Sequence, residues 1–169
     1  KMKGEFGDKI GFHKQITGDV DSIAQLEMID QNPIGKSSRS NPVTYIKAYD
    51  EIRELYARQP LSKMRGFLPK HFSFNVDGGR CDACKGEGEQ VVEMQFLADV
   101  HLTCESCGGK RFKEEVLDIK YKDKSIYDVL ELSVDEAIDF FYDEKNLAKA
   151  IQPLSDVGLG YVKLGQSSD

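Results

Sequence analysis

The sequence predicts a mixed fold, α/β of the α+β kind, in which helical segments carry an inserted β-hairpin module. Three observations lead to this expectation. Apolar residues recur at helical spacing after Asn41 and Pro42. Apolar and polar residues alternate around Val92 and Met94, which is typical of a strand. Two Cys-x-x-Cys pairs flank the alternating segment, so we expect a hairpin whose base is held by cysteines.

The clearest helix is expected to follow Asn41, which suits an N-cap, and Pro42, which suits the first helical position. It should end near the Gln59-Pro60 pair. Its apolar face would comprise Tyr45, Ile46, Tyr49, Ile52, Leu55 and Tyr56. Before this helix, the apolar run over 26–29 suggests a short strand that leads into a loop.

Two further strands are expected beyond this helix. A loop over 66–70 leads into an alternating segment over 72–76, which has the pattern of a short strand. A second strand is expected over 116–121, because its apolar residues also alternate with polar ones.

Capped helices are expected in the last third of the chain. One should begin at Ser125 and another at Ser133, where Glu136 completes a capping box. A short last helix is expected near Asn146, and Pro153 should limit its length because proline lacks the N–H that a helix interior needs. A glycine-rich segment follows it.

Composition narrows the class of protein. The chain has 169 residues, a net charge of −6 and 40% hydrophobic residues, which is enough for a modest core. No apolar run approaches the ~20 residues that cross a bilayer, so we expect no membrane partner and a cytoplasmic location. Basic residues without acids occupy 31–49 and 58–76, whereas 126–144 carries acids without Lys or Arg. The first two stretches could bind a polyanion, although the net negative charge of the whole chain disfavours such binding.

The chain's four cysteines form two pairs, Cys81 with Cys84 and Cys104 with Cys107. Two intervening residues let both sulfurs of a pair reach one metal at about 2.3 Å. Glycines follow each pair and suit turns that point backbone N–H groups at thiolates. A disulfide would need an oxidising compartment, and the first residues lack the apolar core of a signal peptide. We expect one Zn²⁺ per chain in a closed, structural site.

A second motif resembles a phosphate-binding P-loop but does not meet its requirements. The segment 34–37 ends like such a loop, yet Asp30 occupies the position of the first glycine and Pro33 removes an N–H donor. Lys36 and Arg39 nevertheless lie among hydroxyl and amide side chains before an expected helix N-terminus, which suits contact with a phosphate backbone. A solvated loop with a capping Asn is the alternative.

The same residues carry a family resemblance. The sequence over 29–35, followed by Arg-Ser-Asn-Pro at 39–42, resembles a hallmark segment of the UvrA family, whose members belong to the bacterial excinuclease. The segments 72–76, 78–81 and 156–161 and the spacing of the cysteines resemble that family too, in the same order along the chain.

Members of that family are ATP-binding-cassette ATPases that form homodimers, bind damaged double-stranded DNA and load UvrB in nucleotide excision repair. The resemblance implies that this chain is an internal piece of the second cassette. It implies a cassette part with a Q-loop and a DNA-facing segment over 1–59. It further implies an inserted zinc module over 60–122 and, over 123–169, a helical segment that leads to the signature motif.

The resemblance also implies roles for individual residues. Gln31 would be the Q-loop glutamine that senses ATP and Mg²⁺. Lys36 and Arg39 would be DNA-facing, and Cys81, Cys84, Cys104 and Cys107 would bind zinc. No Walker A, signature or Walker B motif is found, so no catalytic residue is assigned. We expect ATP and Mg²⁺ to bind only in the full-length parent, and the chain alone not to hydrolyse ATP.

Two other classes of protein share part of the cysteine pattern. Cys-x-x-Cys-x-Gly-x-Gly at 81–88 also resembles the zinc repeats of DnaJ cochaperones, which carry four such repeats and two zinc ions. A dithiol oxidoreductase would instead place one Cys-x-x-Cys at a helix N-terminus. The metal content separates these classes, since it would be one, two or no zinc ions per chain.

Overall fold

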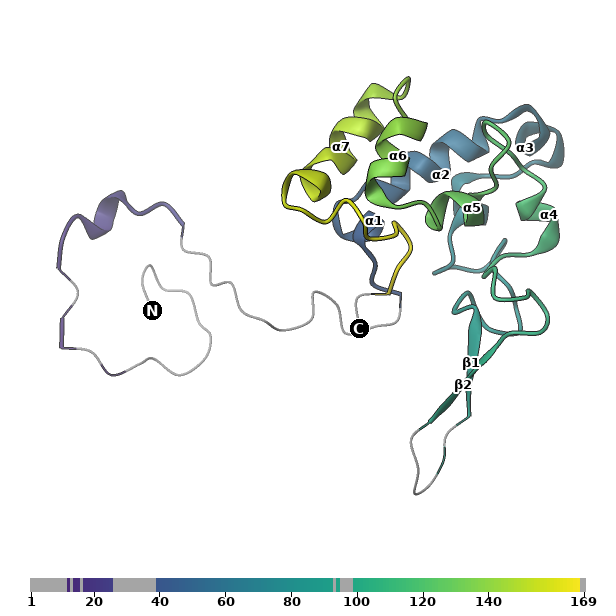
Figure 1. Ribbon diagram of the computed structural model, residues 1–169, viewed down its shortest axis with the longest axis horizontal. Coiled ribbons are helices and arrows are strands. Elements are labelled where there is room, and N and C mark those ends of the chain that lie inside the picture. The colour runs from purple at the N-terminus through teal and green to yellow at the C-terminus, as the bar shows by residue number, and fades with distance from the viewer. Residues whose placement is uncertain are drawn as a thin grey trace. The chain divides into compact units, whose positions relative to one another are not determined.

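The computed structural model describes residues 12, 14–15, 17–25, 39–92, 94 and 99–167. The chain divides into two compact units, Lys1–Asn32 and Pro33–Asp169. In the first unit the described residues form a 3-10 helix, η2, at Val20–Ser22. All other described elements belong to the second unit (Figure 1). The strand expected over 26–29 lies outside the described residues.

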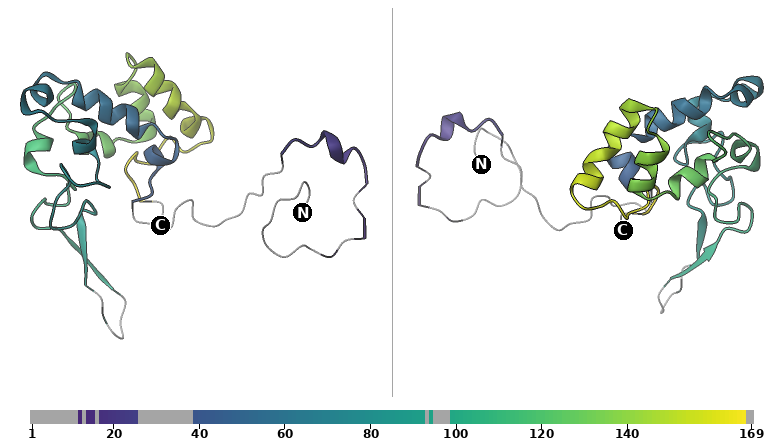
Figure 2. Two further views of the ribbon diagram at one scale, coloured as in Figure 1. Left: turned by 180° about the vertical axis from the view of Figure 1, so that it is seen from behind. Right: turned by 45° about the horizontal axis from the view of Figure 1, so that its top comes forward.

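The second unit combines helices with one small antiparallel sheet, as the sequence predicts. In β1 (Glu89–Val92) and β2 (Val100–Thr103), Glu89 lies opposite Thr103 and Val92 lies opposite Val100. Figures 1 and 2 show this hairpin extending away from the helices. The helical elements are α1 (Pro42–Tyr45), α2 (Tyr49–Ala57), α3 (Pro60–Arg65), η3 (Pro69–Phe72), α4 (Glu114–Leu117), α5 (Ile126–Leu130), α6 (Val134–Phe140) and α7 (Lys145–Asp156).

The helix expected after Asn41 begins where predicted but is interrupted. Asn41 caps α1, with its side-chain oxygen accepting a hydrogen bond of 3.1 Å from the Thr44 N–H. The expectation of one continuous helix is wrong, because Lys47 has a φ of 60° and separates α1 from α2. Ile52 is fully buried on α2 as expected, whereas Tyr45 on α1 is 63% exposed.

The strand expected over 72–76 is also absent from the structure. Phe72 ends η3, and both it and Phe74 are fully buried. Ser73 between them is buried too, so the segment has no solvent-facing side of the kind that the alternation suggested. The Tyr49 hydroxyl donates a hydrogen bond of 2.7 Å to the Phe72 carbonyl, so a side chain rather than a partner strand satisfies that group.

The segment 116–121 likewise forms a helix end and a turn, and the strand expected there is wrong. Helix α4 ends at Leu117. Tyr121 then pairs with Lys124 across a tight turn in which Lys122 and Asp123 both have positive φ. Val116 and Ile119, three residues apart as on a helix, are fully buried against the core, whereas Leu117 and Tyr121 are only partly buried.

The two capped helices are confirmed. The Ser133 hydroxyl accepts from the Glu136 N–H, and the Glu136 carboxylate accepts from the Ser133 N–H at 2.8 Å, an interaction that lowers the pKa of Glu136. The Ser125 cap of α5 has the same form. Helix α7 is longer than expected, because it passes through Pro153 and ends at Asp156. Buried Ile151 and Leu154 on either side of the proline hold its last turns against the core.

One apolar core joins the helices. It gathers residues of α1, α2, α5, α6 and α7 with the buried phenylalanines of the connecting segments. The glycine-rich C-terminal segment closes it, because fully buried Leu164 donates from its N–H to the Leu132 carbonyl at 2.9 Å and accepts from the Val43 N–H at 3.1 Å. Among the described residues, no helix is long and apolar enough to cross a bilayer.

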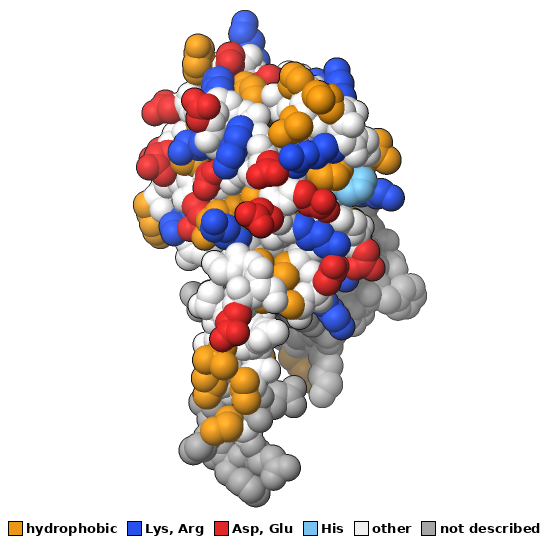
Figure 3. Space-filling model, turned by 90° about the vertical axis from the view of Figure 1, so that its right-hand side faces the viewer, with side chains coloured by type: hydrophobic (Ala, Val, Ile, Leu, Met, Phe, Trp, Pro, Cys, Tyr) orange, Lys and Arg blue, Asp and Glu red, His pale blue; other side chains and the backbone are white. Residues whose placement is uncertain are grey.

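The hairpin takes no part in this core. The register places Val92, Val100 and Leu102 on one face, and each is 42–51% exposed. Figure 3 shows hydrophobic side chains gathered on this projecting part. The buried residues at its base form a second cluster, Cys81, Cys84 and Cys104, with Cys107 packed against it. Within the described residues, the hairpin therefore has no apolar core that could hold it together.

The interruption at Lys47 gives a test of the fold. A residue other than glycine loses about 1 kcal/mol in the left-handed region, so Lys47→Gly should raise the free energy of unfolding by up to that amount. The matched change Lys149→Gly, at an exposed position inside α7, should lower it by about 1 kcal/mol. Urea unfolding of both variants measures the sign of each change in the free energy of unfolding. Equal destabilisation would mean that Lys47 lies in a continuous helix.

Candidate metal centre

A short antiparallel bridge anchors the cysteine module to the helical core. The Cys81 N–H donates to the Arg111 carbonyl at 2.8 Å, and the Lys113 N–H donates to the Gly79 carbonyl at 2.9 Å. Phe112, in the returning segment, is 1% exposed and its ring packs edge-on against that of Phe74. The chain thus enters and leaves the module at one place on the core.

The structure brings all four predicted cysteines together. The sulfurs of Cys81 and Cys104 are 3.9 Å apart, and those of Cys84 and Cys107 are 3.7 Å apart. All four sulfurs lie within 4.8 Å of one another. Each knuckle therefore contributes to a single cluster, which does not match the two separate zinc sites of a cochaperone domain.

The distances fit a tetrahedral metal ion. Four sulfurs at about 2.3 Å from a central zinc would be separated by about 3.8 Å, close to the 3.9 Å and 3.7 Å separations of these two pairs. The cysteines are free thiols rather than disulfides. A set of four thiolates suits a soft metal, and it leaves no coordination position for water.

Backbone N–H groups support the sulfurs. The Gly88 N–H donates to the Cys84 sulfur at 3.3 Å. The N–H groups of Cys107 and Arg111 are directed at the sulfurs of Cys104 and Cys107, respectively. Such outer hydrogen bonds orient metal ligands and stabilise their anionic form.

The thiols differ in acidity without a metal. Burial raises the pKa of Cys107 to about 12, and burial also raises the pKa of Cys84. For Cys104, burial acts in the same direction, but hydrogen bonds from the Cys107 N–H and from neighbouring groups outweigh it and bring the pKa to about 7. Without a metal, the thiols of Cys84 and Cys107 would therefore carry protons at neutral pH, and metal binding must release them.

Of the predicted DNA-facing residues, only Arg39 is among those described. Its Nε donates to the Glu87 carboxylate at 2.6 Å, and its Nη2 donates to the Lys85 carbonyl at 3.2 Å. Arg80 donates to the same carbonyl, also at 3.2 Å. Two guanidinium groups therefore hold the loop of the first knuckle. Lys36 and the predicted nucleotide sensor Gln31 lie outside the described residues.

Sequence reasoning missed this link between Arg39 and the knuckle. The two partners are far apart in the chain, and neither belongs to a motif that would pair them. The single signal was that Glu87 lies between the two knuckle glycines, Gly86 and Gly88, where a carboxylate has no role in binding a metal through four thiolates.

Two glycines provide a matched test of the knuckles. Gly86 lies two residues after Cys84 and Gly108 lies one residue after Cys107, with φ of 87° and 56°. A Cβ at Gly86 would overlap the Phe74 carbonyl, whereas a Cβ at Gly108 would meet open space. Gly108→Ala should cost about 1 kcal/mol of folding free energy through its φ alone. Gly86→Ala should cost about 2 kcal/mol more and weaken metal binding.

Chelator competition and denaturant unfolding of the two metal-loaded variants measure this difference. Equal effects of the two substitutions would show that the close approach of Gly86 to Phe74 does not position the first knuckle.

Comparison with known proteins shows which proteins this chain is similar to. A scan against protein-family models matches none. The chain is 51% identical over 158 residues to UvrABC system protein A of Clostridium tetani, covering 94% of this chain and 17% of that protein. It is 54% identical over 162 residues to UvrABC system protein A of Aquifex aeolicus, covering 92% of this chain and 17% of that protein.

The structure agrees with the sequence comparison. The crystal structure of UvrA2 from Deinococcus radiodurans superposes with a TM-score of 0.84 at 48% sequence identity, covering 89% of this chain and 18% of that one. The chain thus spans about a sixth of the length of the relatives that it matches. Over that segment, about half of its residues are identical to those of proteins named UvrABC system protein A.

Proposed function

We propose that this chain is part of the ATPase that recognises DNA damage in bacterial nucleotide excision repair, and that it supplies a structural zinc site and contacts to the DNA backbone. The observation that carries the proposal is the identity of about half of its residues with UvrABC system protein A along nearly the whole chain. The clustered cysteines support a metal-dependent module within that segment.

The zinc ion has a structural role in this proposal. The site is closed by four thiolates, so it offers no position for a substrate or a reactive water. The described residues of the hairpin bury no apolar side chains of their own. Metal–thiolate bonds therefore supply the free energy that holds the two knuckles, as they do in small metal-dependent domains.

The DNA contact in this proposal is with phosphates. Arg39 and Lys36 belong to a stretch without acids, and local cations outweigh distant carboxylates because salt screens charges beyond about 8 Å. Phosphate contacts carry no sequence information, which suits a protein that must find damage in any sequence. The ion pair of Arg39 with Glu87 means that DNA would compete with an internal partner for this guanidinium.

Further roles are proposed for the longer protein that would contain this segment. Gln31 would sense bound ATP and Mg²⁺, and the protein would act as a homodimer with UvrB as its partner. A cytoplasmic location is part of the same proposal. The segment itself is not proposed to be catalytic.

Metal content tests the structural role. Purified protein that has not met a chelator should contain one zinc per chain by elemental analysis, because four thiolates complete one tetrahedral site. Removing zinc, or replacing Cys84 or Cys107 with Ala, should unfold 81–111 while the helices around Val43 remain folded, as followed by amide NMR signals. Protein without zinc, or a disulfide between Cys81 and Cys84, would contradict the assignment.

DNA binding is tested in the longer protein by the double substitution of Lys36 and Arg39 with Ala. Duplex affinity should fall at every sequence, and the slope of log K against log salt should flatten by up to about 1.8, since each phosphate contact contributes about 0.9. An unchanged affinity and slope in a folded variant would mean that this segment is a structural loop.

Glu87→Gln is the matched control. It retains both cations but removes the carboxylate that pairs with Arg39. If Arg39 binds phosphate, duplex affinity should stay the same or rise. If Arg39 acts only by holding the first knuckle, Glu87→Gln should weaken binding as the double variant does.

A further inference from the structure

The four sulfur ligands are unequally protected from solvent. Cys104 is fully buried, and Cys81 and Cys84 are each 6% exposed. Cys107 alone among the four is partly exposed. Cys107 is therefore the ligand residue with the greatest contact with solvent.

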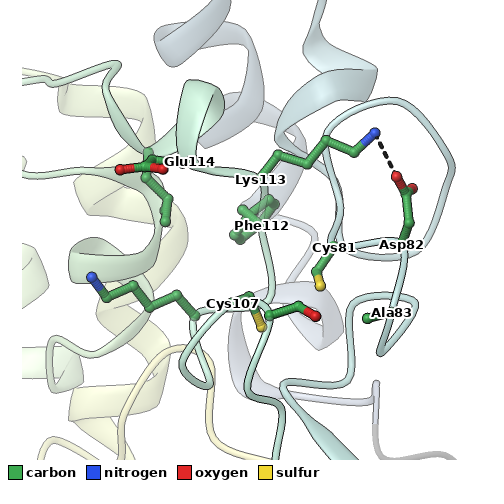
Figure 4. A pocket seen from close by; sticks show the side chains of 10 residues that line it. Cys81, Asp82, Ala83, Cys107, Phe112, Lys113 and Glu114 are labelled. Atoms are coloured by element: carbon green, nitrogen blue, oxygen red, sulfur yellow. Dashed lines mark ion pairs between the residues drawn. The ribbon is translucent and has the colours of Figure 1, made fainter.

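A cavity of about 510 Å³ gives access to this sulfur. Its wall includes Cys107, Ser106 and Lys110 from the second knuckle, and Figure 4 shows how the labelled side chains surround it. Cys81 also borders the cavity but is almost entirely covered. Lys113 also lines the cavity, and its ammonium group pairs with Asp82 at 2.8 Å. A molecule as small as hydrogen peroxide fits easily in this space.

A second sulfur lies ready to react with an oxidised Cys107. The sulfur of Cys84 lies 3.7 Å from that of Cys107, and it belongs to the other knuckle. Redox-sensitive cysteines typically combine thiolate character, an accessible sulfur and a nearby resolving cysteine. Burial alone would keep Cys107 and Cys84 protonated, and a bound zinc ion would hold both as thiolates. Cys107 and Cys84 have this relationship.

We propose that Cys107 is a site of oxidative modification by hydrogen peroxide, with Cys84 as the resolving residue. The Cys107 thiolate attacks one peroxide oxygen, so that an S–O bond forms, the O–O bond breaks and hydroxide leaves to take a proton from solvent. The Cys84 thiolate then attacks the sulfur of the sulfenic acid, so that an S–S bond forms and a second hydroxide leaves to take a proton. Two thiolates are oxidised, one peroxide is reduced and two waters are formed.

This chemistry would open the metal centre. A disulfide between Cys84 and Cys107 removes two of the four ligands, one from each knuckle, and the two remaining thiolates cannot complete a tetrahedral site. Because the hairpin has no apolar core among its described residues, loss of the metal would release the module from its folded arrangement.

The experiment uses the zinc-loaded chain and less than one equivalent of hydrogen peroxide. With dimedone present to trap sulfenic acid, peptide mass spectrometry should find the adduct on Cys107 at least about fivefold more often than on any other cysteine. Without dimedone, a Cys84–Cys107 disulfide should form, and a colorimetric indicator should register one zinc released per disulfide. An even spread of adducts, or first modification at Cys81, would overturn the proposal.

Two matched variants test whether zinc release depends on oxidation at Cys107 or follows from the loss of any one thiolate ligand. Cys107→His and Cys84→His each keep three thiolates and one imidazole, a ligand set that binds zinc. Cys107→His should release zinc at least about fivefold more slowly in peroxide, whereas Cys84→His should still form the sulfenic acid on Cys107. Wild-type zinc release from Cys107→His would refute the assignment. If either variant fails to hold zinc, the adduct map of the unaltered chain decides alone.

Discussion

The convergence of four sulfurs at one point is the constraint on which the rest of the module depends. Helices of the second unit are held by a shared apolar core, but the hairpin projects from that core with its hydrophobic face exposed. Two strands alone are only marginally stable in water. The knuckles therefore need bonds of another kind, and metal–thiolate bonds are strong enough to replace an apolar core.

The module is joined to the rest of the unit by polar contacts as well as by the chain. Arg39 and Arg80 both donate to the Lys85 carbonyl, and Arg39 also pairs with Glu87. These contacts connect the segment before α1 to the first knuckle. A change in the partners of Arg39 would therefore alter the contacts that hold the first knuckle at the base of the hairpin.

Much of this arrangement could be predicted from local sequence signals. The cysteine spacing, the Asn41 cap and the capping box at Ser133 depend on residues within a few positions of one another, and each is found as expected. Alternation of apolar and polar residues predicted strands less reliably than these local signals predicted caps and cysteine pairs. Alternation reports which residues are buried, and buried residues occur in helices and turns as well as in strands. At Phe72 and Phe74, the residue between them is buried as well, so no sheet face exists.

Other features depend on contacts that sequence patterns do not record. The break at Lys47 comes from a single positive φ at a residue that ordinarily favours helix. The pairing of Arg39 with Glu87, and the exposure of Cys107 relative to the other cysteines, follow from how distant segments pack. Equal spacing in the two cysteine pairs gave no indication that their four sulfurs would differ in access to solvent.

The bridge between the Gly79 carbonyl and the Lys113 N–H, at 2.9 Å, has a consequence for how this segment evolves. Because the two ends of the module meet there, the module is attached to the helical core as a single surface loop. The entropic cost of closing such a loop increases only slowly with its length. Insertions or deletions in the projecting arm are therefore tolerated by the helices. The length and shape of the hairpin can therefore change in evolution without a change in the helical core that carries it.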